Sequence, residues 1–152
     1  MDCMPIRQYP SSIVEKLAKK LPFFINGSNP LKLSIFNKKI TILRKDLLKE
    51  MRRNSLIKVQ EGEMPDHIIN TVISQSHLMP ISVYSQPILW NYDYVFRTFT
   101  LPDIMILADG LCSDYEPKLY HKTQVVNPGN FYKDGSFFSI RPLANEINMY
   151  KI

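Results

Sequence analysis

The side chains of this sequence that could do chemistry are three histidines and one aspartate at the end of an apolar run. His67 begins a predicted helix and His121 lies in a polar stretch, so both imidazoles are expected to face solvent. His77 lies where a predicted helix gives way to a loop, which is a better position for a functional side chain. For all three, a hydrogen-bonded structural histidine is the favoured interpretation.

Asp109 is the best-placed acidic residue because it directly follows the apolar run at 104–108. In open α/β sheets, side chains at the carboxyl ends of strands line the active sites. Gly110 follows, and Asp-Gly is a common turn, so a turn is the favoured interpretation. The sequence contains no nucleotide-binding glycine motif, no Gly-x-Ser-x-Gly and no His-Glu-x-x-His, so the residues alone specify no reaction.

Aromatic side chains recur at every second position of one short segment, namely Trp90, Tyr92, Tyr94 and Phe96. This spacing predicts a row on one side of a strand. Such a row could stack nucleic-acid bases, but aromatic rows are more often part of a core or of a partner interface. No basic residue lies between Lys58 and Arg97, so the positive charge expected beside a stacking surface is missing. Packing is the favoured interpretation.

The composition is typical of a globular protein, with 45% hydrophobic and 22% charged residues in 152. The net charge of +5 is unevenly distributed. Residues 1–60 contain 13 Lys and Arg against 4 Asp and Glu, whereas residues 61–152 contain 6 against 10. The basic half could meet phosphate groups, an acidic partner or the acidic half of this chain.

The two cysteines, Cys3 and Cys112, are far apart and have no metal-ligand spacing. Their positions predict a reducing compartment and argue against a zinc ribbon. The first residues lack the apolar core of a signal peptide. No apolar run reaches the roughly 18 residues of a bilayer span, so a soluble, intracellular protein without a membrane partner is expected.

Three helices are expected to position these residues. The first runs from Ser11 to Leu21 and carries an apolar face. The second covers 46–53, with Asp46 as its predicted cap and Leu47, Leu48 and Met51 pointing inward. The third covers 67–75 and buries Ile68, Ile69 and Val72.

The predicted strands surround these helices. Alternating residues at 31–36 and 39–44 predict a hairpin with a turn at Asn37-Lys38. A fully buried strand is expected at 101–109, followed by a polar loop over 110–124. A last hairpin is expected within 125–142, with Asp134-Gly135 as its turn. The predicted fold class is therefore α/β, in an α+β or layered arrangement.

Several segments together resemble one protein family. They are FNKKITILRKDLLKEMRRNSL (36–56), HLMP (77–80), PILWNYDY (87–94), PDIMILAD (102–109) and NPGNF (127–131). In one uninterrupted register, they are similar to the C-terminal part of the B subunit, or second subunit, of eukaryotic DNA polymerase epsilon. The resemblance covers nearly the whole chain. The related subunits of polymerases alpha and delta match these segments less well.

The resemblance implies a calcineurin-like metallophosphoesterase fold, of which residues 1–152 are expected to form a single partial domain, the C-terminal portion. The metal motifs of active members begin with Gly-Asp, Gly-Asn-His or Gly-His, and no glycine of this sequence starts one. His77 and Asp109 occupy vestigial positions, and one imidazole cannot hold two metals. The resemblance therefore implies a lost metal site, no catalytic residues and no cofactor. In this family pattern, Gly129 lets the backbone bend tightly after Asn127.

By resemblance, the chain is a non-catalytic accessory subunit of DNA polymerase epsilon, or a fragment of one, in nuclear DNA replication. Its implied partners are the C-terminal region of the catalytic subunit and other replisome proteins, with DNA reached through the complex. The four aromatic residues of 90–96 are the candidates for partner binding. Two alternatives are a metallophosphoesterase whose N-terminal motifs are missing and a basic nucleic-acid-binding module within 16–58.

Overall fold

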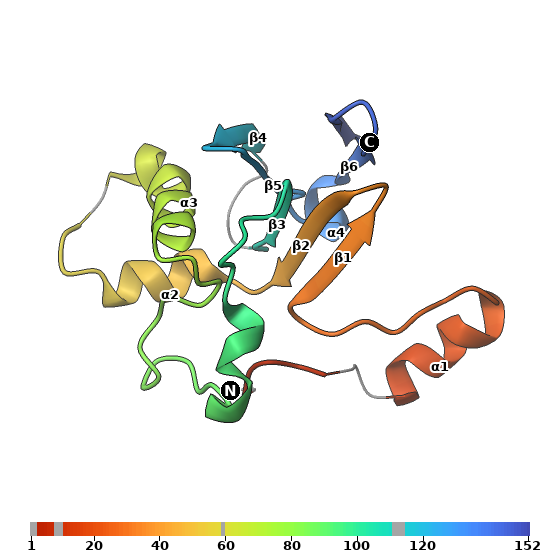
Figure 1. Cartoon of the computed structure of the whole chain (residues 1–152), viewed down its shortest axis with the longest axis horizontal. Coiled ribbons are helices and arrows are strands. Elements are labelled where there is room, and N and C mark those ends of the chain that lie inside the picture. Colours follow the sequence, from red (N-terminus) through yellow and green to blue (C-terminus); the bar gives the residue numbers. More distant parts are fainter. Residues whose placement is uncertain (1–2, 8–10, 59, 111–114) are drawn as a thin grey trace.

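A mixed five-stranded sheet lies between two helices and a two-stranded hairpin in the computed structural model (Figure 1). The structure describes residues 3–7, 11–58, 60–110 and 115–152. Helices α2 (Leu47–Asn54) and α3 (Met64–Ser74) cover one face of the sheet, and strands β6 (Ser136–Arg141) and β7 (Glu146–Lys151) cover the other. The predicted mixed α/β class is confirmed.

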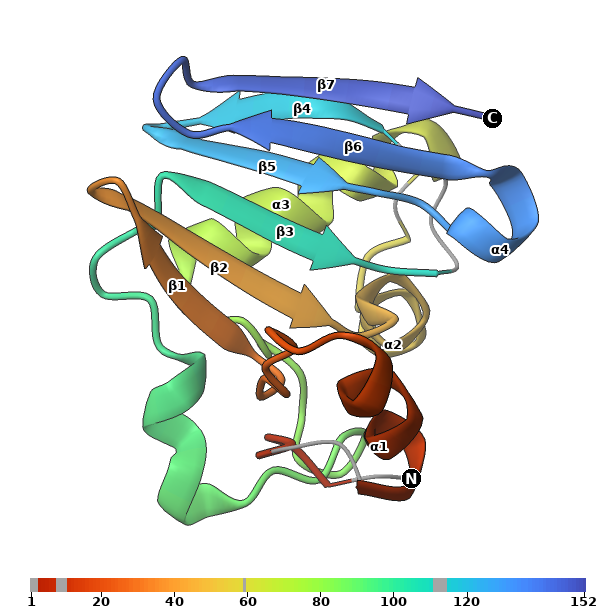
Figure 2. The ribbon, with the colours of Figure 1, turned by 90° about the vertical axis from the view of Figure 1, so that its right-hand side faces the viewer.

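The strand order of the large sheet is β1-β2-β3-β5-β4 (Figure 2). The strands are β1 (Leu31–Ile35), β2 (Lys38–Arg44), β3 (Ile104–Ala108), β5 (Thr123–Asn127) and β4 (Tyr115–Tyr120). The three inner strands, β2, β3 and β5, are parallel, and each outer strand pairs antiparallel with its neighbour. The parallel strands therefore end at one common edge, which the residues after β3 and β5 occupy.

The first hairpin forms as predicted, but its turn lies one residue earlier. Ile35 pairs with Lys38, so the two-residue turn is Phe36-Asn37 and not Asn37-Lys38. Both turn residues have positive φ, 47° and 64°. A two-residue hairpin of this type needs that backbone because it matches the twist of the strands. The pairing of the two strands thus fixes the position of the turn, although phenylalanine rarely adopts a positive φ.

The main core lies between the sheet and the two helices. The predicted inward faces are confirmed, because Leu47, Ile69 and Val72 are almost completely buried. They pack with a set of apolar side chains from β2, β3, β5 and the loop 77–79: Leu43, Met105, Leu107, Val125, Leu78 and Met79. Burying each of these large aliphatic side chains stabilises the fold by about 1.5–3 kcal/mol. The buried strand predicted at 101–109 is therefore confirmed over its central part, as β3 (Ile104–Ala108).

A second, smaller core lies on the other face of the sheet. Ile40, Ile104, Ile106 and Val126 point toward the apolar side chains of the β6–β7 hairpin. The predicted Asp134-Gly135 hairpin turn is wrong. These residues instead end the short helix α4 (Phe131–Asp134), where Gly135 has φ 62° and an added Cβ would lie 2.9 Å from the Ile152 carbonyl oxygen. Hairpin turns and helix C-termini both favour glycine in a left-handed backbone conformation, so an Asp-Gly pair is compatible with either.

The predicted loop over 110–124 is also wrong in its second half. Strand β4 begins at Tyr115 and pairs with β5 through a turn that contains His121. Pro117 lies in an irregularity of the register between Tyr115 and Lys118. Proline has no backbone N–H to donate, and it is tolerated here because an edge strand needs no donor at an irregular position. His121 is exposed in the turn, as predicted.

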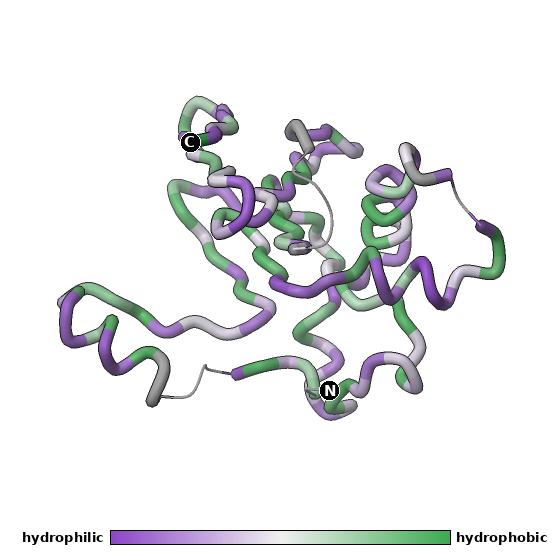
Figure 3. The backbone as a smooth tube through the Cα atoms, turned by 180° about the vertical axis from the view of Figure 1, so that it is seen from behind, coloured by the Kyte–Doolittle hydropathy of each residue, from purple (hydrophilic) through white to green (hydrophobic). Residues whose placement is uncertain are grey.

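The predicted first helix is confirmed as α1 (Ser11–Lys20). Leu17 and Leu21, from its predicted apolar face, are nevertheless exposed. Figure 1 shows α1 standing away from the sheet, and in Figure 3 hydrophobic and hydrophilic residues alternate along it. None of the helices in the described residues combines the length and hydrophobicity of a bilayer span. Cys3 is a free, exposed thiol, whereas Cys112 lies outside the described residues.

Asp66 links the start of α3 to the edge strand β4. One of its carboxylate oxygens accepts hydrogen bonds from the Lys118 ammonium at 2.5 Å and the Tyr120 hydroxyl at 2.8 Å. These two bonds, that from Lys118 first, hold the pKa of Asp66 below its ordinary value. The ionised carboxylate of Asp66 is therefore more stable in the folded state than in the unfolded chain.

We expect Asp66 to make stability pH-dependent in the acidic range. A depressed carboxyl pKa gives stabilisation that is complete above the unfolded pKa and is lost as the pH falls through the folded pKa. The side chain is 40% exposed, and solvent screens such pairs to at most about 1 kcal/mol. In urea unfolding measured from pH 7 to pH 3, the wild-type chain should lose its advantage over Asp66→Asn as the pH drops. An advantage that stays constant down to pH 3 would contradict this role.

Candidate functional site

The edge where the parallel strands end carries the acidic residue best placed for chemistry. Asp109 follows β3 there and is buried. Its carboxylate Oδ2 accepts the backbone N–H of Leu48 at 2.7 Å, in the first turn of α2. This is the bond that a helix-capping side chain makes, and the positive end of the helix dipole favours the negative charge. Asp109 therefore holds β3 and α2 together.

The predicted cap of α2, Asp46, does something else. Its side chain makes no capping bond, and its Oδ1 accepts from Arg44 Nη1 at 2.8 Å and from the Gly110 backbone N–H at 2.9 Å. Burial raises the pKa of Asp46, but the Gly110 and Arg44 donors outweigh it and hold the pKa below its ordinary value. The prediction is wrong because Asp109, 61 residues away in sequence from Leu48, supplies the capping oxygen.

The Asn-Pro-Gly segment closes the same edge from β5. Asn127 is completely buried, and its side-chain amide donates to the Asp109 carbonyl oxygen at 3.2 Å. Its Oδ1 accepts the Gly129 backbone N–H at 3.1 Å, and Gly129 has φ 72°. A side chain other than glycine is strained in that conformation. The expected tight bend at Gly129 is therefore confirmed, and it ties β5 to the end of β3.

His77 belongs to a different network. Its Nδ1 accepts the Met79 backbone N–H at 3.1 Å, so Nε2 carries the proton of the neutral ring and donates to Asp93 Oδ1 at 3.1 Å. Both ring nitrogens are thus hydrogen-bonded, as the structural interpretation predicts. The described residues contain no group of three or more His, Cys, Asp or Glu side chains that could hold a metal ion. His77 bonds to Asp93 and Met79, whereas the Asp109 carboxylate bonds to Leu48, and no hydrogen bond joins His77 to Asp109 in the part of the chain that the structure describes.

Replacing Asp109 with alanine should destabilise the chain by about 2 kcal/mol, because it removes a buried, charged cap from α2. Asp109→Asn keeps an acceptor oxygen but loses the charge, so it should cost about half as much. The measurement is urea unfolding, with Asp134→Ala, an exposed aspartate, as the matched control. Equal stabilities for Asp109→Ala and Asp134→Ala would show that the cap is not used.

The predicted aromatic strand is wrong, because residues 90–96 form a 3₁₀ helix, η2 (Trp90–Phe96). Backbone bonds three residues apart define it, from Tyr92 N to the Leu89 oxygen and from Arg97 N to the Tyr94 oxygen. Asn91 and Asp93 favour turns over strands, which explains the difference. A period of three points Trp90, Tyr92 and Tyr94 in different directions around the helix axis. The aromatic residues are therefore not in one row.

Burial separates Phe96 from the other three aromatic residues. Phe96 is completely buried in the main core, whereas Trp90, Tyr92 and Tyr94 are 72%, 50% and 63% exposed. The rings of Tyr92 and Tyr94 lie 6.5 Å apart and line one groove with Leu89, and Trp90 is exposed on the same short helix. The exposed side chains of Leu89, Trp90, Tyr92 and Tyr94 are named here the aromatic surface. An apolar patch of this kind on a folded chain marks a partner or ligand site.

The aromatic surface is fixed to the core by hydrogen bonds. Asp93 accepts from His77 and, at 2.9 Å, from Arg97 Nε. Burial raises the pKa of Asp93, but these two donors hold it below its ordinary value. The Phe96 backbone oxygen accepts the Leu78 N–H at 2.9 Å. The helix is therefore held in place, and a partner would not have to order it.

A groove of about 630 Å³ runs beside the aromatic surface. It is lined by Pro5, Ile6, Arg7, Ser28, Leu89, Tyr92, Tyr94 and Val95. The N-terminal segment reaches it because Met4 N donates to the Pro87 oxygen and Leu89 N donates to the Met4 oxygen. Residues 5–7 were not predicted as part of a site, since no local pattern indicates a contact across more than 80 positions.

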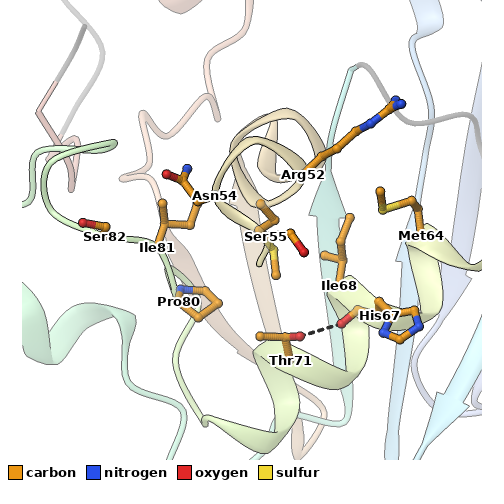
Figure 4. A pocket seen from close by; sticks show the side chains of 11 residues that line it. Arg52, Asn54, Ser55, Met64, His67, Ile68, Thr71, Pro80, Ile81 and Ser82 are labelled. Carbon is orange, nitrogen blue, oxygen red and sulfur yellow. Dashed lines mark hydrogen bonds between the residues drawn. The ribbon is translucent and has the colours of Figure 1, made fainter. Parts of the chain in front are cut away.

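A second hollow, of about 340 Å³, lies between α2, α3 and residues 80–82 (Figure 4). His67 lies at its rim and is exposed as predicted, 3.9 Å from Glu63. The polar side chains that line it are used within the chain: Thr71 donates to the His67 backbone oxygen at 2.7 Å, and Asn54 donates to the Glu50 oxygen at 2.6 Å. These contacts are typical of a helix surface and indicate no reaction.

The chain is similar in sequence to proteins of one known family. The family model for the B subunit of DNA polymerases alpha and epsilon matches residues 2–116. The chain is 34% identical over 149 residues to the DNA polymerase epsilon B subunit of Arabidopsis thaliana, with 96% of this chain and 28% of that protein covered. It is 30% identical to "DNA polymerase epsilon subunit 2" of Bos taurus, with 95% and 27% covered, and 32% identical to that of Homo sapiens, with 85% and 24% covered. The chain thus spans about a quarter of the length of these curated relatives.

Proposed function

This chain belongs to the B subunit family of DNA polymerases alpha and epsilon, and from that premise we propose that it is a non-catalytic accessory subunit of DNA polymerase epsilon, or a fragment of one. In this role it supports nuclear DNA replication by holding other proteins. The names of its relatives support this proposal. The use of the polar edge of the sheet for capping and turn formation also favours assembly over catalysis.

We further propose that residues 1–152 form one partial domain, the C-terminal portion of a calcineurin-like phosphoesterase fold that has lost its metal site. Two features support this. The described chain has a layered arrangement in which a second, two-stranded sheet covers one face of the mixed sheet. The carboxylate of Asp109, at the position where a metal ligand would be useful, caps α2 instead.

The observation that carries the function is the aromatic surface. Its three aromatic side chains are exposed, yet the helix that bears them is anchored by the buried Phe96 and by the bonds to Asp93. Exposed tyrosine and tryptophan on a fixed backbone are typical of the energetic centre of a protein interface. We propose that the C-terminal region of the polymerase catalytic subunit binds here, and that other replisome proteins join through the complex.

Co-expression tests this proposal. The chain and the C-terminal region of the epsilon catalytic subunit should elute together in gel filtration as a complex with one copy of each. The corresponding region of the alpha catalytic subunit serves as the control and should elute separately. Separate elution of the epsilon pair, with the chain shown to be folded by circular dichroism, would count against the proposed partner.

A further inference from the structure

A hollow of about 270 Å³ lies between the β1–β2 hairpin and the segment 97–102. We call it the hairpin pocket. The strand register places Lys32 opposite Thr41 and Ser34 opposite Lys39. Opposed residues of an antiparallel pair share one face of the sheet, so these four polar side chains form one wall. The other wall consists of Arg97, Thr98, Phe99, Thr100 and Pro102.

The pocket exists because the helices do not cover this end of the sheet. Leu43 lies on the same face as Thr41 and Lys39 and packs in the main core under α2 and α3. Two and four residues earlier, the same face carries Thr41 and then Lys39, and no described helix packs over them. A face that changes from apolar to basic along one strand is accessible to an anion at its basic end.

Two ammonium groups of the hairpin pocket pair with no carboxylate in the described chain. Lys32 Nζ donates to the Arg97 backbone oxygen at 2.8 Å, which points the amine at the pocket and leaves two of its protons unused. The Lys39 backbone N–H donates to the Asp103 carboxylate at 2.8 Å, and the Asp103 N–H donates to the Lys39 oxygen at 2.9 Å, so neither bond uses the Lys39 ammonium. The same carboxylate pairs with Lys38 at 3.5 Å. Arg97 is paired with Asp93. Lys32 is exposed overall, and partial burial of its amine lowers the pKa of Lys32.

Thr98 adds an unsatisfied hydroxyl. It is 3% exposed and lines the pocket, and its Oγ1 has no hydrogen-bond partner among the described residues. A buried hydroxyl without a partner has lost the hydrogen bond that it makes with water in the unfolded chain. A phosphate oxygen in the pocket would accept a hydrogen bond from the Thr98 hydroxyl and replace the lost one.

Phe99 supplies a flat surface at the mouth of the pocket. Its ring is 79% exposed. The guanidinium carbon of Arg97 lies 5.9 Å from the ring centroid. Nucleic-acid bases stack on exposed aromatic rings that lie beside basic side chains, here Lys32, Lys39 and Arg97. Such stacking tolerates any base.

We propose that the hairpin pocket binds one nucleotide unit of single-stranded nucleic acid. The phosphate lies between Lys32, Lys39 and the Thr98 hydroxyl, and the base stacks on Phe99. The hydroxyl and both ammonium groups suit phosphate, and the ring beside them favours nucleic acid over an acidic peptide. This activity is separate from the aromatic surface and goes beyond the proposed scaffolding role.

The test is fluorescence anisotropy of a labelled oligo-thymidine of about 12 nucleotides titrated with the full chain at several salt concentrations. Lys32→Gln with Lys39→Gln should weaken binding about tenfold or more and reduce the slope of log affinity against log salt by about 1 to 2. Phe99→Leu should weaken binding about fivefold or more with an unchanged slope. The matched control, Lys16→Gln with Lys20→Gln on α1, removes the same charge from exposed positions and should weaken binding less than about threefold.

Two further measurements keep the result interpretable if the variant does not fold. Lys32→Arg with Lys39→Arg retains both charges and should retain binding. In the unaltered chain, thymidine monophosphate should shift the amide NMR signals of Thr98 and Phe99. Equal losses for the pocket and control variants, or NMR shifts confined to other segments, would overturn the proposal. Tighter binding of an oligo-glutamate peptide than of the oligonucleotide would overturn it in favour of an acidic protein partner.

Discussion

Replacing Trp90 and Tyr92 together with alanine is expected to weaken binding of the proposed partner by about 30-fold or more. The free energy of unfolding should change by less than about 0.5 kcal/mol, because both side chains are largely exposed. Loss of binding without loss of stability separates an interface role from a packing role. The sequence pattern alone did not separate these two roles for the aromatic residues.

The size of the effect follows from the geometry of the aromatic surface. Tryptophan and tyrosine contribute most to binding where they are held on a fixed backbone, because little conformational entropy is lost on association. Asp93 fixes the helix from beneath through His77 and Arg97, and neither alanine substitution touches that network. The variant should therefore present the same backbone without the two large rings.

The measurement is isothermal titration of the C-terminal region of the epsilon catalytic subunit into each variant, with urea unfolding alongside. Tyr84→Ala with Tyr132→Ala is the matched control, since both of these rings are almost fully exposed elsewhere on the chain. The control should bind like the wild type. If both double variants bind equally well, the partner contacts another surface.

The elements that the sequence predicts correctly are those whose signal is local. Helix α3 repeats its apolar residues with a helical period, and β3 is a short apolar run. The hairpin β1–β2 alternates, so only its turn was placed one residue late. In each case the residues that specify the element lie within it, and tertiary contacts add stability without changing its type.

The errors share the opposite property. Residues 90–96 alternate like a strand, but a strand needs a neighbouring strand to pair with. The only β-type pairing beside η2 in the described residues is the single bridge between His77 and Arg97, at the end of the helix. Asp134-Gly135 has the composition of a hairpin turn, but the Gly135 N–H donates to the Phe131 oxygen and closes a helical turn, and the Ile152 N–H donates to the Gly135 oxygen. In both places the local pattern allowed two structures, and the one that forms is joined by backbone bonds to a segment distant in the sequence.

The same reasoning explains why the candidate site was predicted only in part. Asp109 was singled out correctly as a residue at the carboxyl edge, but its bond to Leu48 spans 61 positions. No periodicity or motif encodes such a contact. The nearer candidate, Asp46, looked like the cap because sequence rules consider neighbours first. The hairpin pocket was missed for the same reason, because Lys32 and Thr98 meet only when the chain folds.

Phe96 is the residue for which interface and core roles predict the most different outcomes. Phe96→Ala should lower the free energy of unfolding by about 3–5 kcal/mol. The side chain is completely buried in the main core, 5.8 Å from the His77 ring, so truncation leaves a cavity that the packed sheet and α3 cannot close. For a domain of this size, that is a large part of a total stability of about 5–15 kcal/mol.

Phe99→Ala provides the internal control, because it removes the same ring three residues further along, where the ring is exposed. It should change the unfolding free energy by less than about 0.5 kcal/mol. Urea denaturation followed by circular dichroism measures both variants under identical conditions. Because Phe96 also supports Asp93 and the aromatic surface, partially folded Phe96→Ala should bind the partner weakly, whereas Phe99→Ala should bind normally. Similar stabilities for the two variants would mean that η2 does not pack as described, and the aromatic surface would lose its anchor.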